Sequence, residues 1–500
     1  MNKRWEKGNI KIHMKVKDII IRQKDNSNIA ICYKNLNITY KSLYEEAYRH
    51  SKNIDKIQHN RNVGIFFHNS IDYAIGYFAT AFLDNIIIPI EDSIKRESLW
   101  SIINYCEISL IVTNNENSKY LQEMLIDFEY RVCIYNIDTF EHMYVGGKDI
   151  IVQGTDDEED VAIMLHTSGT TSDPKKVMLT NANLIANIES NIASLGITEN
   201  DVCLIVLPMF FGYCNSSQFL SHLYLGARIV IYDSTFAPRK FLQLIDKEKC
   251  TNTTCVPSML FLVVKSCKRE KFDLSTLRYL CFGGGIMPVD MLKKIITFFD
   301  KTGIIQTYGQ TEASPRVTCL LPEDTERKIG SVGKAIPNVC VDVFDKDDNP
   351  VQLGKIGEIV VKGPNVMKGY YKKPEITKNT LRNGWLHTGD LGKFDDEGYL
   401  YIVGRIKNII ISGGLNIYPE EIEEVLINHP QIKEVVVLPE KHDILGEVPI
   451  AKIVLKEGCV CEQSEIMEYC MQNLPSNKVP GKIIFCEALN KTYTGKVKRV

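Results

Sequence analysis

Short apolar runs alternate with amphipathic stretches along the first half of the chain, from about residue 18 to 234. The runs Val63–Phe67 and Ile86–Ile90 predict strands, and helical patterns lie between them. The same alternation resumes at Tyr279–Phe282, which three glycines and a predicted helix over 288–299 follow. Strands that alternate with helices are typical of a parallel sheet in an α/β fold.

The pattern changes between about residues 330 and 403. Short strand-like runs are separated there by Gly, Pro, Asn and Asp, and the runs are Val339–Phe344, Ile359–Lys362 and Tyr399–Val403. Turn residues between short strands are typical of antiparallel sheets and small barrels. This part is therefore predicted to be a small antiparallel or barrel-like unit.

A third pattern begins after Gly404. A helix start is predicted at 418–426, with a proline in its first turn and acidic residues that complement the helix dipole. Strands at Glu434–Leu438 and Ile450–Leu455 and a helix at Gln463–Gln472 complete this part. We expect an N-terminal domain over residues 1–404 and a small C-terminal α+β domain over 405–500.

Composition narrows the class of protein. A chain of 500 residues with 44% hydrophobic and 24% charged residues is expected to form a globular enzyme of more than one domain. Its 59 basic and 62 acidic side chains give a net charge of −3, which argues against a nucleic-acid partner. No run reaches the ~18 apolar residues of a membrane span. The 15 cysteines lack metal-ligand spacing, so we expect reduced thiols in a cytoplasmic protein.

The polar segment 167–176 is the strongest chemical signal. It carries five hydroxyl side chains, one glycine and two lysines, between the apolar strand Val161–Leu165 and a predicted helix. Backbone N–H groups, hydroxyls and a lysine can surround phosphate oxygens, so the segment predicts a polyphosphate site. A flexible surface loop is the alternative. The segment is not a Walker A loop, because Pro174 stands where that loop needs glycine.

Four further motifs follow in order along the chain. Each has an ordinary explanation by itself: an exposed acid, a turn, a loop or a solvated basic tail. They are Tyr308-Gly309-Gln310-Thr311-Glu312, Gly384-Trp385-Leu386-His387-Thr388-Gly389-Asp390, the segment 404–414, and the segment 491–499, which has three lysines and Gly495.

Together and in this order, the five motifs resemble those of the AMP-forming adenylate enzymes, which include acyl-CoA synthetases, adenylation domains and luciferases. The resemblance implies a large N-terminal domain of α/β subdomains with a small β-barrel, followed by a mobile C-terminal domain. It implies two reaction steps. A carboxylate first attacks the α-phosphate of ATP with Mg²⁺, giving acyl-AMP and pyrophosphate. A thiol of coenzyme A, or of a carrier-protein phosphopantetheine, then takes the acyl group and releases AMP.

The resemblance also implies roles for individual residues. It assigns catalysis to Lys496, Thr311 and Glu312, where Thr311 contacts the α-phosphate, Glu312 binds the metal ion and Lys496 offsets the charge of the reacting anions. It assigns ATP or AMP binding to Thr167, Ser168, Gly169, Thr170, Thr171, Lys175, Gly283, Gly284, Gly285, Tyr308, Gly309, Asp390 and Arg405. Within this set, Tyr308 and the three glycines form the adenine slot, and Asp390 and Arg405 contact the ribose.

Domain movement is a further implication. Lys407 matches the hinge of the family, and Gly413 and Gly414 match the loop that lines a tunnel for the thiol arm. The chain departs from the family at Ser172 and Lys176, where glycine is common. The polyphosphate contacts remain, although the mobility of this loop is expected to differ.

The segment Phe210, Phe211, Gly212 and Tyr213 is predicted to line the acyl pocket. No aspartate lies between Pro208 and Phe219 to neutralise a substrate ammonium, so an amino acid is disfavoured. The aromatic residues favour a fatty or other apolar carboxylic acid. Coenzyme A is preferred as acceptor over an acyl or peptidyl carrier protein. A non-catalytic nucleotide- or acyl-binding protein is the remaining alternative, which the presence of Glu312, Asp390 and Lys496 disfavours.

Overall fold

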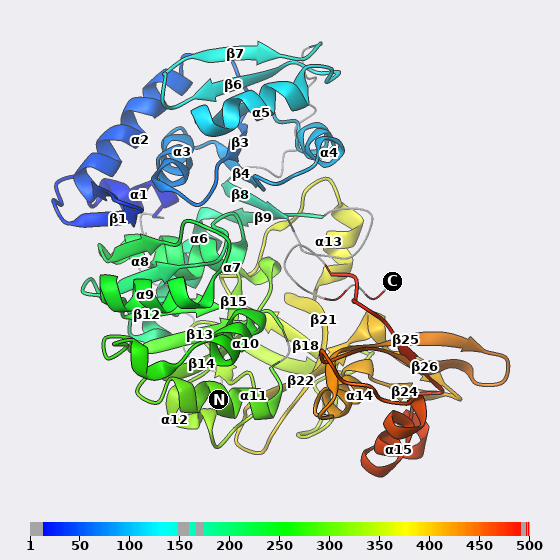
Figure 1. The fold of residues 1–500 in the computed structure, drawn as a ribbon. Helices are drawn as coiled ribbons and strands as arrows, with labels where there is room; N and C mark the ends of the chain where they lie inside the picture. The colour runs from blue at the N-terminus through cyan, green and yellow to red at the C-terminus, as the bar shows by residue number, and fades with distance from the viewer. Residues whose placement is uncertain are drawn as a thin grey trace, which may run out of the picture.

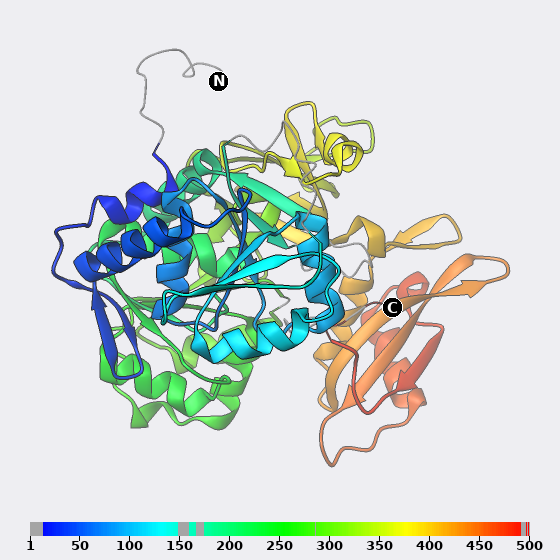
Figure 2. The same ribbon diagram turned by 90° about the horizontal axis from the view of Figure 1, so that it is seen from above.

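The computed structural model describes residues 14–148, 160–166, 175–285, 287–491, 497 and 499. Two large sheets with flanking helices form most of the N-terminal part, and a smaller unit formed by the last hundred residues lies to one side of them in both views (Figures 1 and 2). The expected α/β fold with a large N-terminal and a small C-terminal domain is confirmed.

The first large sheet has eight strands in the order β19-β9-β8-β4-β3-β5-β6-β7. Strands β3, β4, β5 and β6 pair in parallel, as the alternation of strands and helices predicts. The strands are β3 (Asn62–Phe66), β4 (Ile86–Ile90), β5 (Leu110–Thr113), β6 (Val132–Asn136), β7 (His142–Val145), β8 (Val161–His166), β9 (Lys176–Thr180) and β19 (Gly369–Tyr370). The helices beside it are α1 (Val16–Ile21), α2 (Tyr40–Ile54), α3 (Ile71–Phe82), α4 (Arg96–Cys106), α5 (Asn115–Leu125) and α13 (Pro374–Thr380).

The second large sheet has nine strands in the order β16-β15-β14-β13-β12-β10-β11-β1-β2. Its strands are β1 (Ile29–Tyr33), β2 (Leu36–Thr39), β10 (Val202–Ile205), β11 (Arg228–Ile231), β12 (Asn252–Cys255), β13 (Tyr279–Gly283), β14 (Gly303–Gly309), β15 (Arg316–Leu320) and β16 (Lys334–Ala335). Its helices are α6 (Asn181–Leu195), α7 (Gly212–Cys214), α8 (Ser221–Leu225), α9 (Pro238–Glu248), α10 (Pro257–Ser266), α11 (Val289–Phe298) and α12 (Pro322–Thr325). One contiguous apolar core joins residues of both large sheets.

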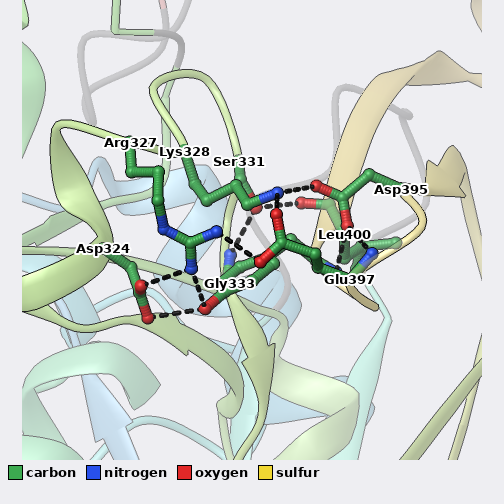
Figure 3. A network of polar contacts seen from close by, with 9 residues as sticks. Asp324, Arg327, Lys328, Ser331, Gly333, Asp395, Glu397 and Leu400 are labelled. Carbon is green, nitrogen blue, oxygen red and sulfur yellow. Dashed lines mark hydrogen bonds and ion pairs between the residues drawn. The ribbon is translucent and has the colours of Figure 1, made fainter.

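An antiparallel sheet follows where the sequence pattern changes. It consists of β17 (Cys340–Phe344), β18 (Gly357–Lys362), β20 (Leu381–Arg382), β21 (Trp385–Phe394) and β22 (Leu400–Arg405). The turn between β21 and β22 is fastened to the segment after α12 by polar contacts (Figure 3). Lys328 Nζ lies 2.7 Å from Asp395 Oδ2 and 2.6 Å from Glu397 Oε1.

The C-terminal elements bury an apolar core of their own, which includes Ile410, Ile422, Val437 and Ile453. They are β23 (Ile410–Ser412), β24 (Leu415–Ile417), α14 (Pro419–Ile427), β25 (Ile432–His442), β26 (Gly446–Leu455), α15 (Gln463–Asn473) and β27 (Lys482–Phe485). Pro419 at the first position and Glu420 and Glu421 in the first turn start α14 as the sequence predicts.

Local sequence signals also determine where α6 begins and ends. The Thr180 hydroxyl accepts a hydrogen bond from the Asn183 backbone N–H, and the Asn183 side chain accepts one from the Thr180 N–H. Gly196 closes the helix at φ 59°, a conformation that favours glycine. No helix in the described part of the chain is both long and apolar enough to cross a lipid bilayer.

Candidate active site

The predicted polyphosphate segment connects β8 to β9, which pair as neighbouring antiparallel strands. Thr167, Ser168, Gly169, Thr170 and Thr171 lie outside the described residues. Lys175 is described, and its Nζ lies 4.8 Å from the centroid of the Tyr370 ring. Its positive charge is therefore held at the edge of the first large sheet.

Tyr370 also connects Lys175 to Glu312. The Tyr370 hydroxyl donates a 2.8 Å hydrogen bond to Glu312 Oε1. Burial raises the pKa of the Glu312 carboxyl, while the Tyr370 hydrogen bond and the charges of Arg405 and Lys175 lower it. Sequence reasoning missed Tyr370, and only its position in the run Gly369-Tyr370-Tyr371 marked it as an aromatic residue near a turn.

The Glu312 carboxylate suits a magnesium ion that is held mainly by phosphate oxygens. Mg²⁺ is commonly bound by one or two carboxylates together with the phosphates of a nucleotide. The described residues contain no cluster of three or more His, Cys, Asp or Glu side chains arranged for a metal ion. A single carboxylate beside Lys175 thus fits Mg²⁺ bound together with a polyphosphate.

A tight turn after β14 positions Thr311 and Glu312. A Cβ atom on Gly309 would lie 1.7 Å from the Pro315 carbonyl oxygen, so only glycine allows this approach of the backbone. Thr311 and Glu312 form a short 3₁₀ turn, and the Glu312 carbonyl accepts a 2.9 Å hydrogen bond from the Met367 N–H. The two predicted catalytic residues are therefore held on a backbone that is fixed at both sides.

The two predicted ribose contacts, buried Asp390 and exposed Arg405, form an ion pair. Asp390 is 4% exposed, and its Oδ1 lies 2.7 Å from Arg405 Nε. Its Oδ2 accepts a 2.8 Å hydrogen bond from the Tyr308 hydroxyl. Asp390 and Arg405 are cross-strand partners on β21 and β22. The Tyr308 hydroxyl therefore orients Asp390, and the stacking of its ring on adenine stays a prediction.

The first of the three glycines of the predicted adenine slot ends β13, and the other two follow the strand. A Cβ on Gly283 would lie 2.6 Å from the Thr307 carbonyl oxygen, so no side chain fits there. Gly284 and Gly285 are exposed, and Gly284 has φ 78°. Backbone without side chains is therefore open to a flat ligand at this edge of the second large sheet.

The predicted acyl segment lies directly beside the predicted α-phosphate contact. A Cβ on Gly212 would lie 3.1 Å from Leu165 Cδ1 and 3.8 Å from Thr311 Cγ2. The rings of Phe210 and Phe211 lie 4.6 Å apart and form an aromatic wall. The predicted acyl segment and the predicted α-phosphate contact are therefore neighbours in the structure.

Tyr213 ends this acyl segment. Its hydroxyl is 2.6 Å from Thr307 Oγ1, and burial raises the pKa of Tyr213 far above its ordinary value. Tyr213 thus contributes a neutral polar group to a wall that is otherwise apolar.

Cations from the polyphosphate segment and from the C-terminal part of the chain act on one another. Burial and the charge of Arg405 lower the pKa of Lys407, and Lys175 and Arg499 act in the same direction. Arg499 is anchored on α14, where its Nη2 lies 2.7 Å from Glu423 Oε2. Lys496 lies outside the described residues, and the bridge from Lys491 to Val497 flanks it. Such a concentration of positive charge favours a polyanionic ligand.

Gly413 and Gly414 form the turn between β23 and β24, with φ 56° and 81°. The Gly413 N–H donates a 2.8 Å hydrogen bond to the Leu445 carbonyl oxygen, which lies within the C-terminal domain. A Cβ on Gly414 would meet open space. The structure does not bring these two glycines to the residues around Thr311, so their predicted role needs a second arrangement of the domains.

The burial of two charged side chains was also missed by sequence reasoning. Lys176 is 1% exposed and Arg316 is 2% exposed. The signal for both is a charged residue at the first position of an apolar strand, Lys176 in β9 and Arg316 in β15. Sequence alone does not reveal to which side of the strand such a side chain points.

The fold, with a large N-terminal α/β domain and a small C-terminal domain, is that of the adenylate-forming enzymes. The chain matches the family described as AMP-binding enzyme over residues 21–371, and the AMP-binding enzyme C-terminal domain over residues 421–496. The protein therefore belongs to the AMP-binding enzyme family. It is an AMP-forming acid–thiol ligase.

Relatives with known names make the comparison more specific. The 2-succinylbenzoate–CoA ligase of Bacillus cytotoxicus is 32% identical over 474 residues, 94% of both chains. The o-succinylbenzoate CoA synthetase MenE of Bacillus subtilis, solved with its acyl-adenylate intermediate, superposes with a TM-score of 0.84 at 27% identity over 96% of both chains. ATP-bound MatB of Rhodopseudomonas palustris has a TM-score of 0.84 at 27% identity over 97% of both chains. None of these relatives supports the expected fatty acid or a carrier-protein partner.

Proposed function

We propose that this enzyme activates an aromatic carboxylic acid of the 2-succinylbenzoate type and transfers the acyl group to coenzyme A. The observation that carries the proposal is the closeness of Gly212 to Thr311, because a Cβ on Gly212 would lie 3.8 Å from Thr311 Cγ2, beside the Phe210–Phe211 wall. It provides an aromatic surface for the acid next to the residue predicted to hold the α-phosphate. The names of the relatives support both the acid and coenzyme A.

The first step joins the acid to AMP. ATP binds with its β- and γ-phosphates at the segment 167–175, and its ribose hydroxyls bind Asp390. Mg²⁺ held by Glu312 neutralises phosphate charge when it is bound. Thr311 orients the α-phosphate, and Lys496 offsets the repulsion between the two reacting anions, which is worth roughly 3–4 kcal/mol on the scale of one preorganised donor. The carboxylate oxygen attacks phosphorus and pyrophosphate leaves.

The second step requires the C-terminal domain to move. We propose the boundary at residues 404/405 and the pivot at Lys407, which lies in the short 3₁₀ turn Ile406–Asn408 between β22 and β23. The movement withdraws Lys496 and brings Gly413 and Gly414 to the acyl-AMP. The thiol then attacks the acyl carbon and AMP leaves.

Product analysis tests the proposal. The enzyme is incubated with ATP, Mg²⁺, 2-succinylbenzoate and either coenzyme A or a phosphopantetheinylated carrier protein. We expect an acyl-CoA of the matching mass, formation of AMP, and no mass shift of the carrier protein. Loading of the carrier protein with no consumption of coenzyme A would overturn the choice of acceptor. The assay is repeated with decanoate in place of 2-succinylbenzoate. A preference for decanoate would overturn the proposal that the substrate is aromatic.

A further inference from the structure

Arg316 is the most unusual charged residue in the interior. It opens β15, is 2% exposed, and is among the largest fully buried side chains. Its Nε, Nη1 and Nη2 atoms have no hydrogen-bond partner within the described part of the chain. A guanidinium group stays protonated at every physiological pH. The folded protein therefore holds a permanent positive charge in its interior.

The groups around Arg316 do not supply a counter-charge. Those that act on it electrostatically are Cys281, Tyr213, Cys319 and Tyr279. Burial raises the pKa of all four groups, and the pKa of Cys319 is raised to about 11. All four groups are therefore neutral at pH 7. The Tyr279 hydroxyl is itself buried without a partner among the described residues. An unpaired buried charge is strongly unfavourable, so an anion bound beside Arg316 would stabilise the folded protein.

Arg316 is close to the acyl segment. Its cross-strand partner is Gly309, at the start of the turn that holds Thr311. Tyr213 belongs to the acyl segment. Burial has the largest effect on its pKa, and the charge of Arg316, which lowers this pKa, has the second largest. The Tyr213 hydroxyl is also hydrogen-bonded to Thr307 Oγ1 on β14, the strand that pairs with β15. The positive charge and the reaction centre thus lie on the same two strands and share one wall residue.

We propose that Arg316 binds a second carboxylate of the substrate, so that the enzyme selects dicarboxylic acids. The proposal rests on the proposed function, because 2-succinylbenzoate carries one carboxylate to be activated and another on its ring or side chain. A guanidinium can bind a carboxylate with two parallel N–H···O bonds, which adds orientation to attraction. Arg316 is then the residue that determines specificity, while Thr311 and Lys496 serve any acid.

The test compares acids in pairs that differ by one carboxylate. Initial rates of carboxylate-dependent ATP–pyrophosphate exchange are measured for 2-succinylbenzoate and for the analogue that lacks the ring carboxylate. Phthalate with benzoate and succinate with butyrate are further pairs. For the wild-type enzyme we expect kcat/KM to favour the better dicarboxylic acid by ~10²-fold over its partner, the scale for a buried charge pair.

Two variants connect this preference to Arg316. For Arg316→Gln we expect the preference to fall to within about threefold, through loss of the dicarboxylic acid only, with KM for ATP unchanged. Arg316→Lys keeps the charge without the two-pronged geometry and is expected to retain part of the preference. Equal loss for both acids of a pair, or an unchanged preference in Arg316→Gln, would overturn the proposal.

The wild-type enzyme gives a second readout that does not depend on the variants folding. A dicarboxylic acid is expected to raise the melting temperature without ATP, while its monocarboxylic partner and chloride at equal ionic strength do not. If chloride alone protects the protein, the site binds an inorganic ion and the proposal is wrong. Activation of another dicarboxylic acid in place of 2-succinylbenzoate would overturn the proposed substrate and leave the role of Arg316 standing. Activation of 2-succinylbenzoate and its analogue at equal rates would overturn the role of Arg316 and leave the proposed substrate standing.

Discussion

At the scale of single residues, Lys176 shows how one departure from the family changes the physics of the site. Its side chain is buried in the first large sheet, and its Nζ has no hydrogen-bond partner within the described residues. Burial lowers the pKa of this amine, and His166, its cross-strand neighbour, has its pKa lowered to about 4 by burial and by Lys176. The last residue of the polyphosphate segment is therefore a buried amine, which is energetically unfavourable.

We predict that Lys176→Met stabilises the protein, with a melting temperature about 2 °C higher at pH 7, because a buried amine without a partner is replaced by an apolar side chain. The pKa of Lys176 is lower in the folded than in the unfolded state, so below the unfolded pKa of ~10.4 the unfolded state binds more protons. Wild-type stability at this group therefore rises with pH, and the advantage of the variant shrinks toward pH 10. Calorimetry from pH 7 to 10 measures it.

Exposed Lys355 provides the matched control, since Lys355→Met removes a lysine without changing burial. A Lys176→Met protein that is less stable than wild type, or an advantage that does not change with pH, would show that the buried amine has a partner in solution.

At the scale of elements, a polar network attaches the β21–β22 turn to the segment after α12 (Figure 3). Lys328 contacts Asp395 and Glu397, and Arg327 contacts Asp324 and Glu397. Strands β21 and β22 carry Asp390 and Arg405 of the predicted ribose site. The network therefore helps to hold the two strands that position this site. The hydrogen bonds from Lys328 and Arg327 lower the pKa of Glu397.

Lys328→Met is therefore predicted to lower the melting temperature by a few degrees and to raise KM for ATP, because the β21–β22 turn loses its attachment. The contribution of Glu397 is present above its unfolded pKa of ~4.3 and is lost as pH falls through its lower folded pKa. The gap between wild type and variant is expected to close below about pH 4. A gap in melting temperature that is constant down to pH 3 would contradict this account.

The helices and strands were easier to predict from the sequence than the contacts within the candidate active site. The strands near Val63 and Ile86 and the helix near residue 289 follow from local periodicity, which depends only on neighbouring residues. The contacts Tyr370–Glu312 and Tyr308–Asp390 join residues 58 and 82 positions apart, so no local pattern reports them. The inward direction of Arg316 is likewise a property of the packed sheet and not of the sequence around it.

At the scale of the whole molecule, the account depends on two arrangements of the C-terminal domain. We predict that Lys496→Ala lowers the rate of adenylation by a factor of ~10²–10³ and leaves transfer from supplied acyl-AMP to coenzyme A nearly unchanged. Single-turnover assays of each half-reaction measure this. Equal loss in both steps would argue against withdrawal of Lys496 between them.

The pivot has its own test. Lys407→Pro stiffens the backbone, so it is predicted to slow thiolation more than adenylation, while Lys407→Ala keeps the backbone free and serves as the control. If Lys407→Pro transfers the acyl group as fast as Lys407→Ala, the pivot lies elsewhere.

Isotope exchange between pyrophosphate and ATP measures most directly whether this enzyme forms an acyl-AMP. The enzyme is given ATP, Mg²⁺ and labelled pyrophosphate, with and without 2-succinylbenzoate and in the absence of coenzyme A. The account predicts that label enters ATP only when the acid is present, because reversible formation of acyl-AMP is required. Exchange that does not depend on any carboxylic acid, or no exchange with any acid tested, would contradict it.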